Sequence, residues 1–405
     1  ILCDGESLPF ICAWGELGLD GRLKSSGQTL RALYAAWKHG ANWLVLPTCD
    51  RADLAEAWAL LEESSPSDGQ VQPPRLCLLS NLSDWVGKES LEKFEHMVSR
   101  AATAPRSSTS ASLPLGPQLA RSIVIAASGE HSVYLVGARG AGKSTAIDML
   151  ARIRPRANAQ ERLTRALLQD LAGVKRQEGP IRVSQNVRPA ALIGRVRGSE
   201  IRPGQFSLAH GGILVADELP EWSRDSLEIL REPLERGQIS LTRAEGSAEL
   251  PSRFLLAATG NLCPCGGARC RCPPSIRERY ARRISGPLLD RIDLAVFVRA
   301  ELGAPETPVT FLEEQVARTR ESLLRSWGST PGSWRAEAVE AILQERPTLQ
   351  NSPLLQQAVS LRSRHKLLRV AATLAALDSR PTQILEADLL EAQSYRIEIP
   401  DVYIS

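Results

Sequence analysis

The stretch that decides the fold of this 405-residue chain is Gly137-Ala138-Arg139-Gly140-Ala141-Gly142-Lys143-Ser144. It fits the pattern G-x-x-x-x-G-K-[ST], in which glycines let successive backbone N–H groups turn inward around phosphate oxygens. An apolar strand is expected at 133–136, directly before it, and a helix beginning near Lys143 would aim its positive end at the phosphates. These eight residues and Thr145 therefore predict a nucleotide site. Lys143 would hold the β- and γ-phosphates, and the hydroxyl of Ser144 would ligate Mg²⁺.

Two adjacent carboxylates follow a second apolar stretch. Asp217 and Glu218 come directly after the predicted strand 213–216. Open α/β sheets bind their ligands at the carboxyl ends of strands, so we expect Asp217 to hold Mg²⁺ through water and Glu218 to polarise the attacking water as general base. Such a pair alone is more often a solvated strand end or a helix N-cap. The phosphate loop upstream favours the catalytic interpretation.

A third apolar strand, predicted at 254–258, ends in the polar residues Thr259-Gly260-Asn261. An Asn beside the carboxylates could orient the attacking water or contact the γ-phosphate, although an Asn after Gly is by itself typical of a turn. Short, continuously apolar strands separated by helical patterns indicate a parallel sheet covered on both faces. The predicted fold class is therefore α/β, with Asn261 at the nucleotide site.

Changes in pattern along the chain divide it into four parts. Residues 1–98 alternate short strands with helical patterns, such as a strand at 43–47 and a helix at 29–39, and predict a small α/β domain. Residues 99–116 are rich in Ser, Thr, Ala and Pro and predict a linker. Residues 117–300 form the predicted nucleotide-hydrolysing core. Residues 301–405 predict an all-helical lid, with helices at 312–327, 336–344, 354–377 and 386–395.

Composition limits the class of protein without naming an activity. The net charge of +3 permits nucleic-acid binding but does not argue for it. No apolar run is long enough to cross a bilayer, and the start at Ile1 has neither an initiator Met nor the features of a secretory signal. We therefore expect a cytoplasmic protein that does not bind membranes. In that compartment its cysteine thiols would be reduced.

Four of the eight cysteines lie within ten residues, in the pattern C-x-C-x4-C-x-C. Four thiolates can build a closed tetrahedral Zn²⁺ site with no open position for catalysis. A disulfide-linked loop and a set of spare thiols are the alternatives. The spacing favours a structural zinc site made by Cys263, Cys265, Cys270 and Cys272.

Two basic features could contact nucleic acid. Residues 237–253 are typical of a hairpin, with Arg243 near its tip. An arginine cluster follows the cysteines. Cations on accessible loops give sequence-independent affinity for phosphates, but a solvated surface or a subunit interface would have the same composition. The cluster consists of Arg269, Arg271, Arg277, Arg279, Arg282 and Arg283.

Several of these runs together resemble the ComM/YifB family, which are magnesium-chelatase-like AAA+ ATPases. The resemblance extends over residues 118–396 and is carried by Gly204-Gln-Phe-Ser-Leu-Ala-His210, Asp217-Glu-Leu-Pro-Glu221, Leu230-Arg-Glu-Pro-Leu-Glu235, Asn261-Leu-Cys-Pro-Cys265 and Ser285-Gly-Pro-Leu-Leu-Asp-Arg291-Ile-Asp293. It implies a homo-hexameric ring that binds ATP between subunits and acts as a motor on DNA, with branch migration in natural transformation as the best-known role.

The same resemblance implies roles for two arginines. Arg291 is similar to the arginine finger that reaches the γ-phosphate of the neighbouring subunit, and Arg362 is similar to the second sensor on the helical lid. The local sequence alone would favour surface salt bridges for both.

The segment Gly15-Glu-Leu-Gly-Leu-Asp-Gly-Arg-Leu-Lys24 resembles the Lon-protease-like domain that precedes the motor in this family. Leu30 stands where the Lon pattern has its catalytic lysine, and the segment of the nucleophile would lie near or before Ile1. Because leucine cannot act as a base, we expect this domain to be proteolytically inactive.

Two other departures from the family pattern concern nucleotide affinity and coupling. Gln185-Asn186 replaces the paired histidines of the family, and Leu113-Pro-Leu-Gly-Pro-Gln118 replaces the box near the adenine. Neither change removes a phosphate or magnesium contact. The leading hypothesis is a DNA motor. The alternative is a protein-remodelling or metal-insertion ATPase of the magnesium-chelatase/MoxR type, and Leu30 opposes an ATP-dependent protease.

Overall fold

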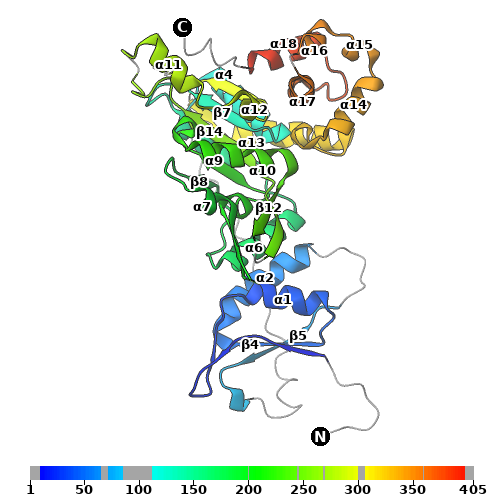
Figure 1. Ribbon diagram of the computed structural model, residues 1–405. Coiled ribbons are helices and arrows are strands. Elements are labelled where there is room, and N and C mark those ends of the chain that lie inside the picture. Colours follow the sequence, from blue (N-terminus) through cyan, green and yellow to red (C-terminus); the bar gives the residue numbers. More distant parts are fainter. Residues whose placement is uncertain are drawn as a thin grey trace.

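The computed structural model describes residues 10–64, 72–84, 112–198, 200–243, 246–267, 270–299, 306–358 and 360–396. Figure 1 shows an N-terminal region with β4 and β5 at one end, a central region built on a sheet, and a C-terminal group of helices beside that sheet. In the described part of the chain, no helix combines the length and apolar character of a membrane-spanning segment.

The central region contains a parallel sheet of five strands in the order β15-β7-β14-β11-β8. Strand β14 lies between β7 and β11 although it follows both in sequence, so the carboxyl ends of these three strands are neighbours. This confirms the predicted α/β class with a parallel sheet. The strands are β7 (Val133–Val136), β8 (Ile181–Val183), β11 (Ile213–Ala216), β14 (Leu255–Gly260) and β15 (Leu294–Phe297).

Both faces of the sheet are buried. Leu135 and Val215 point into a core shared with α4 (Pro117–Gly129) and α5 (Lys143–Ile153), whereas their neighbours Tyr134 and Leu214 point into a second core on the other face. Successive strand residues alternate between faces, and helices cover each side, which explains the continuously apolar strands of the sequence.

The C-terminal helices pack on one face of this sheet. Residues of α13 (Val309–Trp327) and α17 (Leu361–Leu377) belong to the same core as β7 and β11, so the helical region and the sheet share one apolar interior. Between and after them lie α14 (Ala336–Gln344), α15 (Pro347–Gln350), α16 (Pro353–Gln356) and α18 (Glu386–Ser394).

One predicted helix is wrong. The sequence predicted a continuous helix over 354–377, but α16 ends at Gln356 and α17 begins at Leu361. Ser360 is in an extended conformation and its hydroxyl accepts a hydrogen bond from the backbone N–H of Ser363 at 3.1 Å. A serine side chain that caps a helix in this way favours a new start over continuation, because it replaces the missing intrahelical partner.

The N-terminal region has a parallel sheet in the order β1-β4-β5 and packs on the central region through α6 (Ala159–Ala172). Leu163 and Ala166 of α6 belong to the same apolar cluster as Leu30 and Leu33. Leu30 is 0% exposed, so this leucine is a core residue. The elements are β1 (Ile11–Ala13), β2 (Glu16–Leu17), β3 (Leu23–Lys24), α1 (Thr29–Lys38), β4 (Trp43–Pro47), α2 (Arg51–Ser64) and β5 (Arg75–Leu79).

The Lon-like identity of this region stays a prediction, and the segment expected to precede Ile1 or lie near it is outside the described residues. Most of the predicted linker is outside them too. Its residues 112–114 form β6 (Ser112–Pro114), which lies directly before α4 in the sequence. Strand β6 pairs antiparallel with β16 (Glu306–Pro308).

Candidate nucleotide site and cysteine cluster

The phosphate loop runs from the end of β7 to the first residue of α5, as the sequence predicted. Gly142, directly before the helix, has φ +92°, a conformation that residues with a Cβ rarely adopt. A Cβ on Gly137 would lie 2.3 Å from the backbone oxygen of Val298. Glycine is therefore required at both ends of the loop, and α5 begins at Lys143 with its N-terminus facing the loop.

Lys143 is held at the centre of the site. Its Nζ donates hydrogen bonds to the backbone oxygens of Gly137 at 2.6 Å and Ala138 at 2.9 Å, and to Oδ1 of Asn261 at 3.2 Å. Burial lowers the pKa of Lys143, while the charge of Glu218 acts in the opposite direction. The cation and the carboxylate are therefore close enough to influence each other.

Asn261 and Thr259 link the ends of neighbouring strands. The Nδ2 of Asn261 donates to Oε1 of Glu218 at 3.4 Å, and the hydroxyl of Thr259 accepts from the backbone N–H of Glu218 at 2.9 Å. Glu218 has φ +49°, which is unusual for a residue with a side chain. Such outliers are retained where the surroundings fix them, often at active sites. The structure thus brings together three of the predicted residues: Lys143, Glu218 and Asn261.

Asp217 follows β11 at the same edge. Its backbone N–H donates to the oxygen of Val183 at 3.3 Å, and its Oδ2 lies 3.8 Å from Nη1 of Arg182. Arg182 also contacts Asp148 of α5. Neither Arg182 nor the role of Thr259 was predicted from the sequence, because an arginine in a short strand and a threonine before Gly-Asn carry no distinctive pattern.

The two arginines assigned by resemblance meet at one carboxylate. Arg291 and Arg362 both contact Glu235 of α10 (Arg231–Arg236), and Arg291 also donates to the backbone oxygen of Pro287 at 2.6 Å. The hydrogen bond from Arg291 and the charges of both arginines lower the pKa of Glu235 despite its partial burial. The side chain of Arg291 is 11% exposed and that of Arg362 is 52% exposed, so Arg291 is the more firmly held.

The four clustered cysteines converge directly after β14. Their sulfurs all lie within 4.8 Å of one another, with Sγ–Sγ distances of 3.0 Å for Cys263–Cys265 and 3.2 Å for Cys263–Cys270. A tetrahedral zinc with Zn–S bonds near 2.3 Å needs sulfurs about 3.8 Å apart. Hydrogen bonds from Cys263 and from the backbone of Gly267 lower the pKa of Cys265 to about 6, which favours the thiolate that metals bind. The cluster can hold a metal ion, and its cysteines are free.

Two β-hairpins pack against each other beside the sheet. The predicted hairpin is present as β12 (Gln238–Arg243) and β13 (Gly246–Pro251), with Arg243 at the end of β12. The second hairpin, β9 (Gly194–Arg197) with β10 (Glu200–Pro203), was not predicted. A Cβ on Gly246 would lie 3.3 Å from Cγ1 of Val196 and 3.5 Å from the backbone oxygen of Gly198.

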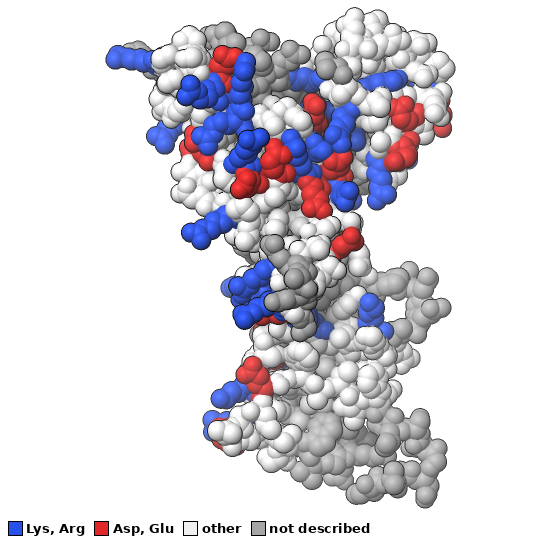
Figure 2. Space-filling model, in the orientation of Figure 1, with Lys and Arg blue, Asp and Glu red and all other residues white. Residues whose placement is uncertain are grey.

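Exposed arginines lie on the second hairpin and on or beside α11 (Pro274–Ala281). Arg195, Arg197 and Arg202 are exposed on β9 and β10. In the predicted cluster, Arg282 pairs with Glu278 and Arg283 pairs with Glu221 at 3.3 Å. Arg269 lies outside the described residues. Figure 2 shows basic side chains gathered over the α11 end of the molecule, with acidic groups between them.

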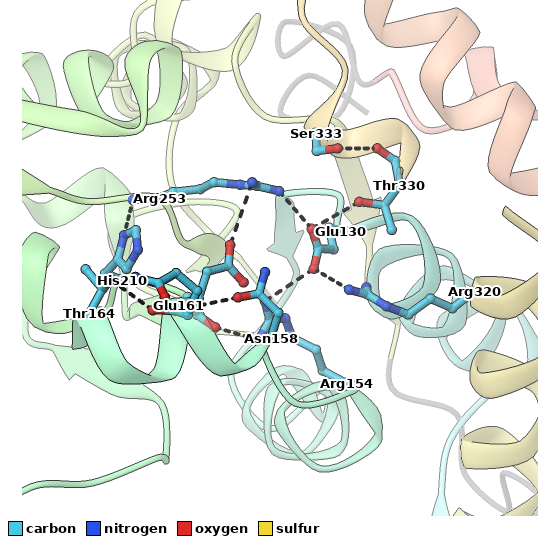
Figure 3. A network of polar contacts seen from close by, with 12 residues as sticks. Glu130, Arg154, Asn158, Glu161, Thr164, His210, Arg253, Arg320, Thr330 and Ser333 are labelled. Carbon is cyan, nitrogen blue, oxygen red and sulfur yellow. Dashed lines mark hydrogen bonds and ion pairs between the residues drawn. The ribbon is translucent and has the colours of Figure 1, made fainter. Parts of the chain in front are cut away.

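Away from the nucleotide site, Glu130 joins several elements (Figure 3). Its carboxylate accepts hydrogen bonds from Arg320 of α13 at 2.9 Å, Arg253 at 3.2 Å and Thr330 at 3.1 Å, and lies 3.6 Å from Arg154 at the end of α5. Burial would raise the pKa of Glu130, but the arginines outweigh it and lower the pKa to about 2. This network attaches the C-terminal helices to the sheet region.

Comparisons with known proteins agree with this geometry. The family model for magnesium chelatase, subunit ChlI, matches residues 115–304. An uncharacterized protein of Mycobacterium tuberculosis (strain ATCC 25618 / H37Rv) is 30% identical over 406 residues, which cover 94% of this chain and 78% of the relative. The uncharacterized protein YifB of Salmonella typhimurium is 31% identical over 410 residues, covering 94% and 76%. The chain belongs to the YifB/ComM family.

The competence protein ComM of Haemophilus influenzae is 29% identical over 409 residues, covering 94% of this chain and 76% of the relative. The family predicted from the motifs is therefore confirmed. As a YifB/ComM member with a ChlI-type domain, the chain is a magnesium-chelatase-like AAA+ ATPase, and this domain implies ATP and Mg²⁺ as its ligands.

Proposed function

We propose that this chain is the subunit of an ATP-hydrolysing ring motor that acts on DNA, with a role of the branch-migration or helicase type in recombination or natural transformation. The observation that carries the DNA part is the pair of packed hairpins β9–β10 and β12–β13, on which Arg195, Arg197 and Arg202 are exposed. The name of one relative, competence protein ComM, agrees with an activity on DNA.

The chain's own residues divide the work of hydrolysis. Lys143 binds the β- and γ-phosphates, and Ser144 and Asp217 hold the metal. When bound, Mg²⁺ supplies charge neutralisation on the phosphates. Glu218 accepts a proton from the attacking water, and Asn261 orients that water, since its amide lies 3.4 Å from the carboxylate of Glu218. The rest of the phosphate loop and Thr145 bind phosphate through backbone N–H groups.

The proposed assembly is a homo-hexamer with ATP between subunits. Arg291 is the residue that reaches the neighbouring subunit's γ-phosphate, and Glu235 fixes its direction by binding it together with Arg362. A guanidinium supplied from the next subunit would offset charge that develops in the transition state. Hydrolysis in one subunit then depends on the position of the next.

We also propose that Cys263, Cys265, Cys270 and Cys272 hold a structural Zn²⁺. The donor set is four thiols with free sulfurs within 4.8 Å of one another, which suits zinc and leaves no open coordination position.

DNA contact in this proposal is electrostatic. The exposed arginines of β9 and β10 lie on the hairpin that packs against β12 and β13, and Arg271 and Arg279 near α11 have no ion pair with any described residue. Cations on such surfaces bind phosphates without reading sequence, with affinity that falls as salt rises.

A protein-remodelling ATPase of the chelatase/MoxR type is the alternative, since it would use the same nucleotide site.

The test compares ATPase rates without DNA, with single-stranded DNA and with forked DNA across a salt series. We expect stimulation that declines with salt, and a double variant Arg195→Ala/Arg197→Ala should bind DNA more weakly with a shallower salt slope, by about one unit per lost phosphate contact. The matched control is Arg318→Ala/Arg325→Ala, which removes the same charge from the exposed face of α13. If DNA neither stimulates the ATPase nor binds in a salt-dependent way, the DNA proposal is wrong. If only an unfolded protein stimulates the ATPase, the remodelling alternative is favoured.

A further inference from the structure

We propose that the cysteine cluster positions the phosphate loop, so that metal held by the four thiols strengthens nucleotide binding. The four cysteines are not among the residues predicted to contact phosphate. One short segment, residues 263–267, nevertheless connects the cysteine cluster to the phosphate loop. This inference rests on the proposed metal site and does not depend on the proposed action on DNA.

The connection is a direct hydrogen bond. The backbone N–H of Arg139, in the middle of the phosphate loop, donates to the backbone oxygen of Gly266 at 2.9 Å. Gly266 is itself held by a turn, since its N–H donates to the oxygen of Cys263 at 3.1 Å. The residue that supports the phosphate loop is therefore bonded to one cysteine of the cluster and adjacent in sequence to another, Cys265.

The loop at Gly266 lies in contact with both the phosphate loop and Asn261. Gly266 is buried with φ +64°, and a Cβ there would lie 3.4 Å from Cγ and Cδ of Arg139 and 3.4 Å from Nδ2 of Asn261. The loop therefore packs between Arg139 and the same Asn261 that contacts Lys143 and Glu218. A shift of the loop would move both the phosphate loop and the water-orienting residue.

The surroundings of the cluster contribute little apolar packing to hold this shape. Cys263 is 0% exposed, but Cys265 and Cys270 are exposed, as are Pro264, Gly267 and Arg271. In a segment without an apolar core, metal binding supplies the folding free energy. Metal at the four thiols would thus fix residues 263–267, and with them the oxygen of Gly266 that binds Arg139.

The opposite end of the phosphate loop has a support of its own. The N–H of Gly137 donates to the oxygen of Gly260 at 3.2 Å, within the sheet. Release of the metal should therefore loosen the middle of the loop without unfolding it. The loss of one supporting hydrogen bond predicts a weakening of nucleotide binding by roughly 3- to 10-fold.

The test measures binding of a fluorescent ADP analogue in magnesium-free buffer, before and after removal of zinc by a zinc-selective chelator, and again after zinc is restored. We expect the Kd to rise by roughly 3- to 10-fold on removal and to recover on restoration. The variant Cys265→Ser/Cys272→Ser should show the raised Kd permanently. The matched control is Cys12→Ser/Cys49→Ser, which removes two thiols from the N-terminal region.

A second measurement separates a local effect from unfolding. Hydrogen exchange should increase on metal release in a peptide covering residues 137–143 and stay unchanged in one covering β11. A Kd that does not change although metal analysis shows complete release overturns the proposal, as does equal exchange in both peptides. Absence of metal from the purified protein would overturn the inference together with the zinc site, while the proposed DNA motor would be unaffected.

Discussion

The ammonium group of Lys143 donates a 3.2 Å hydrogen bond to the side-chain oxygen of Asn261. Lys143 belongs to the loop after β7, and Asn261 directly follows β14, the neighbouring strand. Because β14 also borders β11, the amide of the same Asn261 reaches Glu218 at 3.4 Å. One side chain therefore connects the proposed phosphate-binding cation to the proposed base.

Replacing Asn261 tests this connection. We expect Asn261→Ala to bind ATP with nearly unchanged affinity, because Lys143 keeps its bonds to two backbone oxygens. Turnover should fall by roughly 100-fold, the effect of removing one preorganised polar group from an active site. Steady-state kinetics and nucleotide titration check both parts. Asn351→Ala, an exposed position in the C-terminal helices, is the control, and an unchanged kcat in Asn261→Ala would contradict the role.

Glu218→Gln separates binding from chemistry. The amide keeps the size and the hydrogen-bonding oxygen of the side chain but cannot accept the proton of the attacking water. We expect ATP to bind, and turnover to fall by about 100-fold or more. Single-turnover hydrolysis measures the step directly. The control Glu221→Gln changes a carboxylate three residues away that pairs with Arg283. Equal turnover in Glu218→Gln and the wild type would remove Glu218 as the base.

The nucleotide site could be predicted from sequence because each part is a contiguous run. The strands β7 and β11 begin and end at the predicted residues. In each, four apolar residues lie between a polar segment and a functional loop, which fixes both ends of the strand. Asn261 lies beside the carboxylate because β14 lies between β7 and β11, and this strand order comes from the structure and not from the sequence.

Contacts between distant parts of the chain could not be predicted in this way. Glu235 binds Arg291 and Arg362, and Glu130 binds Arg320 and Arg253, across separations that no local pattern encodes. Glutamates and arginines are common on every surface, so only the folded arrangement identifies partners. The same holds for α6, whose apolar residues complete the core of the N-terminal region.

The cysteine cluster predicts a defined metal content. Protein purified under reducing conditions should contain about one zinc per chain, because four thiolates complete one tetrahedral site. Metal analysis by mass spectrometry measures this directly. Cys265→Ser/Cys272→Ser should lose the metal and Cys12→Ser/Cys49→Ser should keep it. A zinc content near zero in the wild type would reject the site.

The proposed action of Arg291 on a neighbouring subunit predicts complementation. Arg291→Ala alone should lose at least about 100-fold in turnover, because a finger stabilises transition-state charge, and Lys143→Ala alone should not bind ATP productively. In mixed rings, however, the intact Arg291 of a Lys143→Ala subunit can serve the intact site of an Arg291→Ala subunit. We therefore expect the mixture to hydrolyse ATP faster than either variant. No gain in mixtures that demonstrably co-assemble would contradict a finger acting between subunits.

Glu130 predicts a specific dependence of stability on pH. Its pKa is lowered from 4.5 to about 2 in the folded chain, so its contribution is fully present above pH 4.5 and is lost as the pH falls toward 2. The shift corresponds to roughly 3 kcal/mol of folding free energy. At pH 7, Glu130→Gln should lower the free energy of unfolding by about that amount, since it leaves Arg320, Arg253 and Arg154 without their shared carboxylate.

Urea unfolding of the wild type and Glu130→Gln from pH 7 down to pH 3 measures both effects. The difference between the two proteins should shrink below pH 4.5, because protonation removes in the wild type the charge that the variant already lacks. The control is Glu321→Gln, whose pair with Arg325 is exposed on α13 and should contribute less than about 1 kcal/mol. If the two stability curves stay parallel through this range, the arginines around Glu130 do not hold it as a carboxylate, and the attachment of the C-terminal helices to the sheet depends on apolar packing alone.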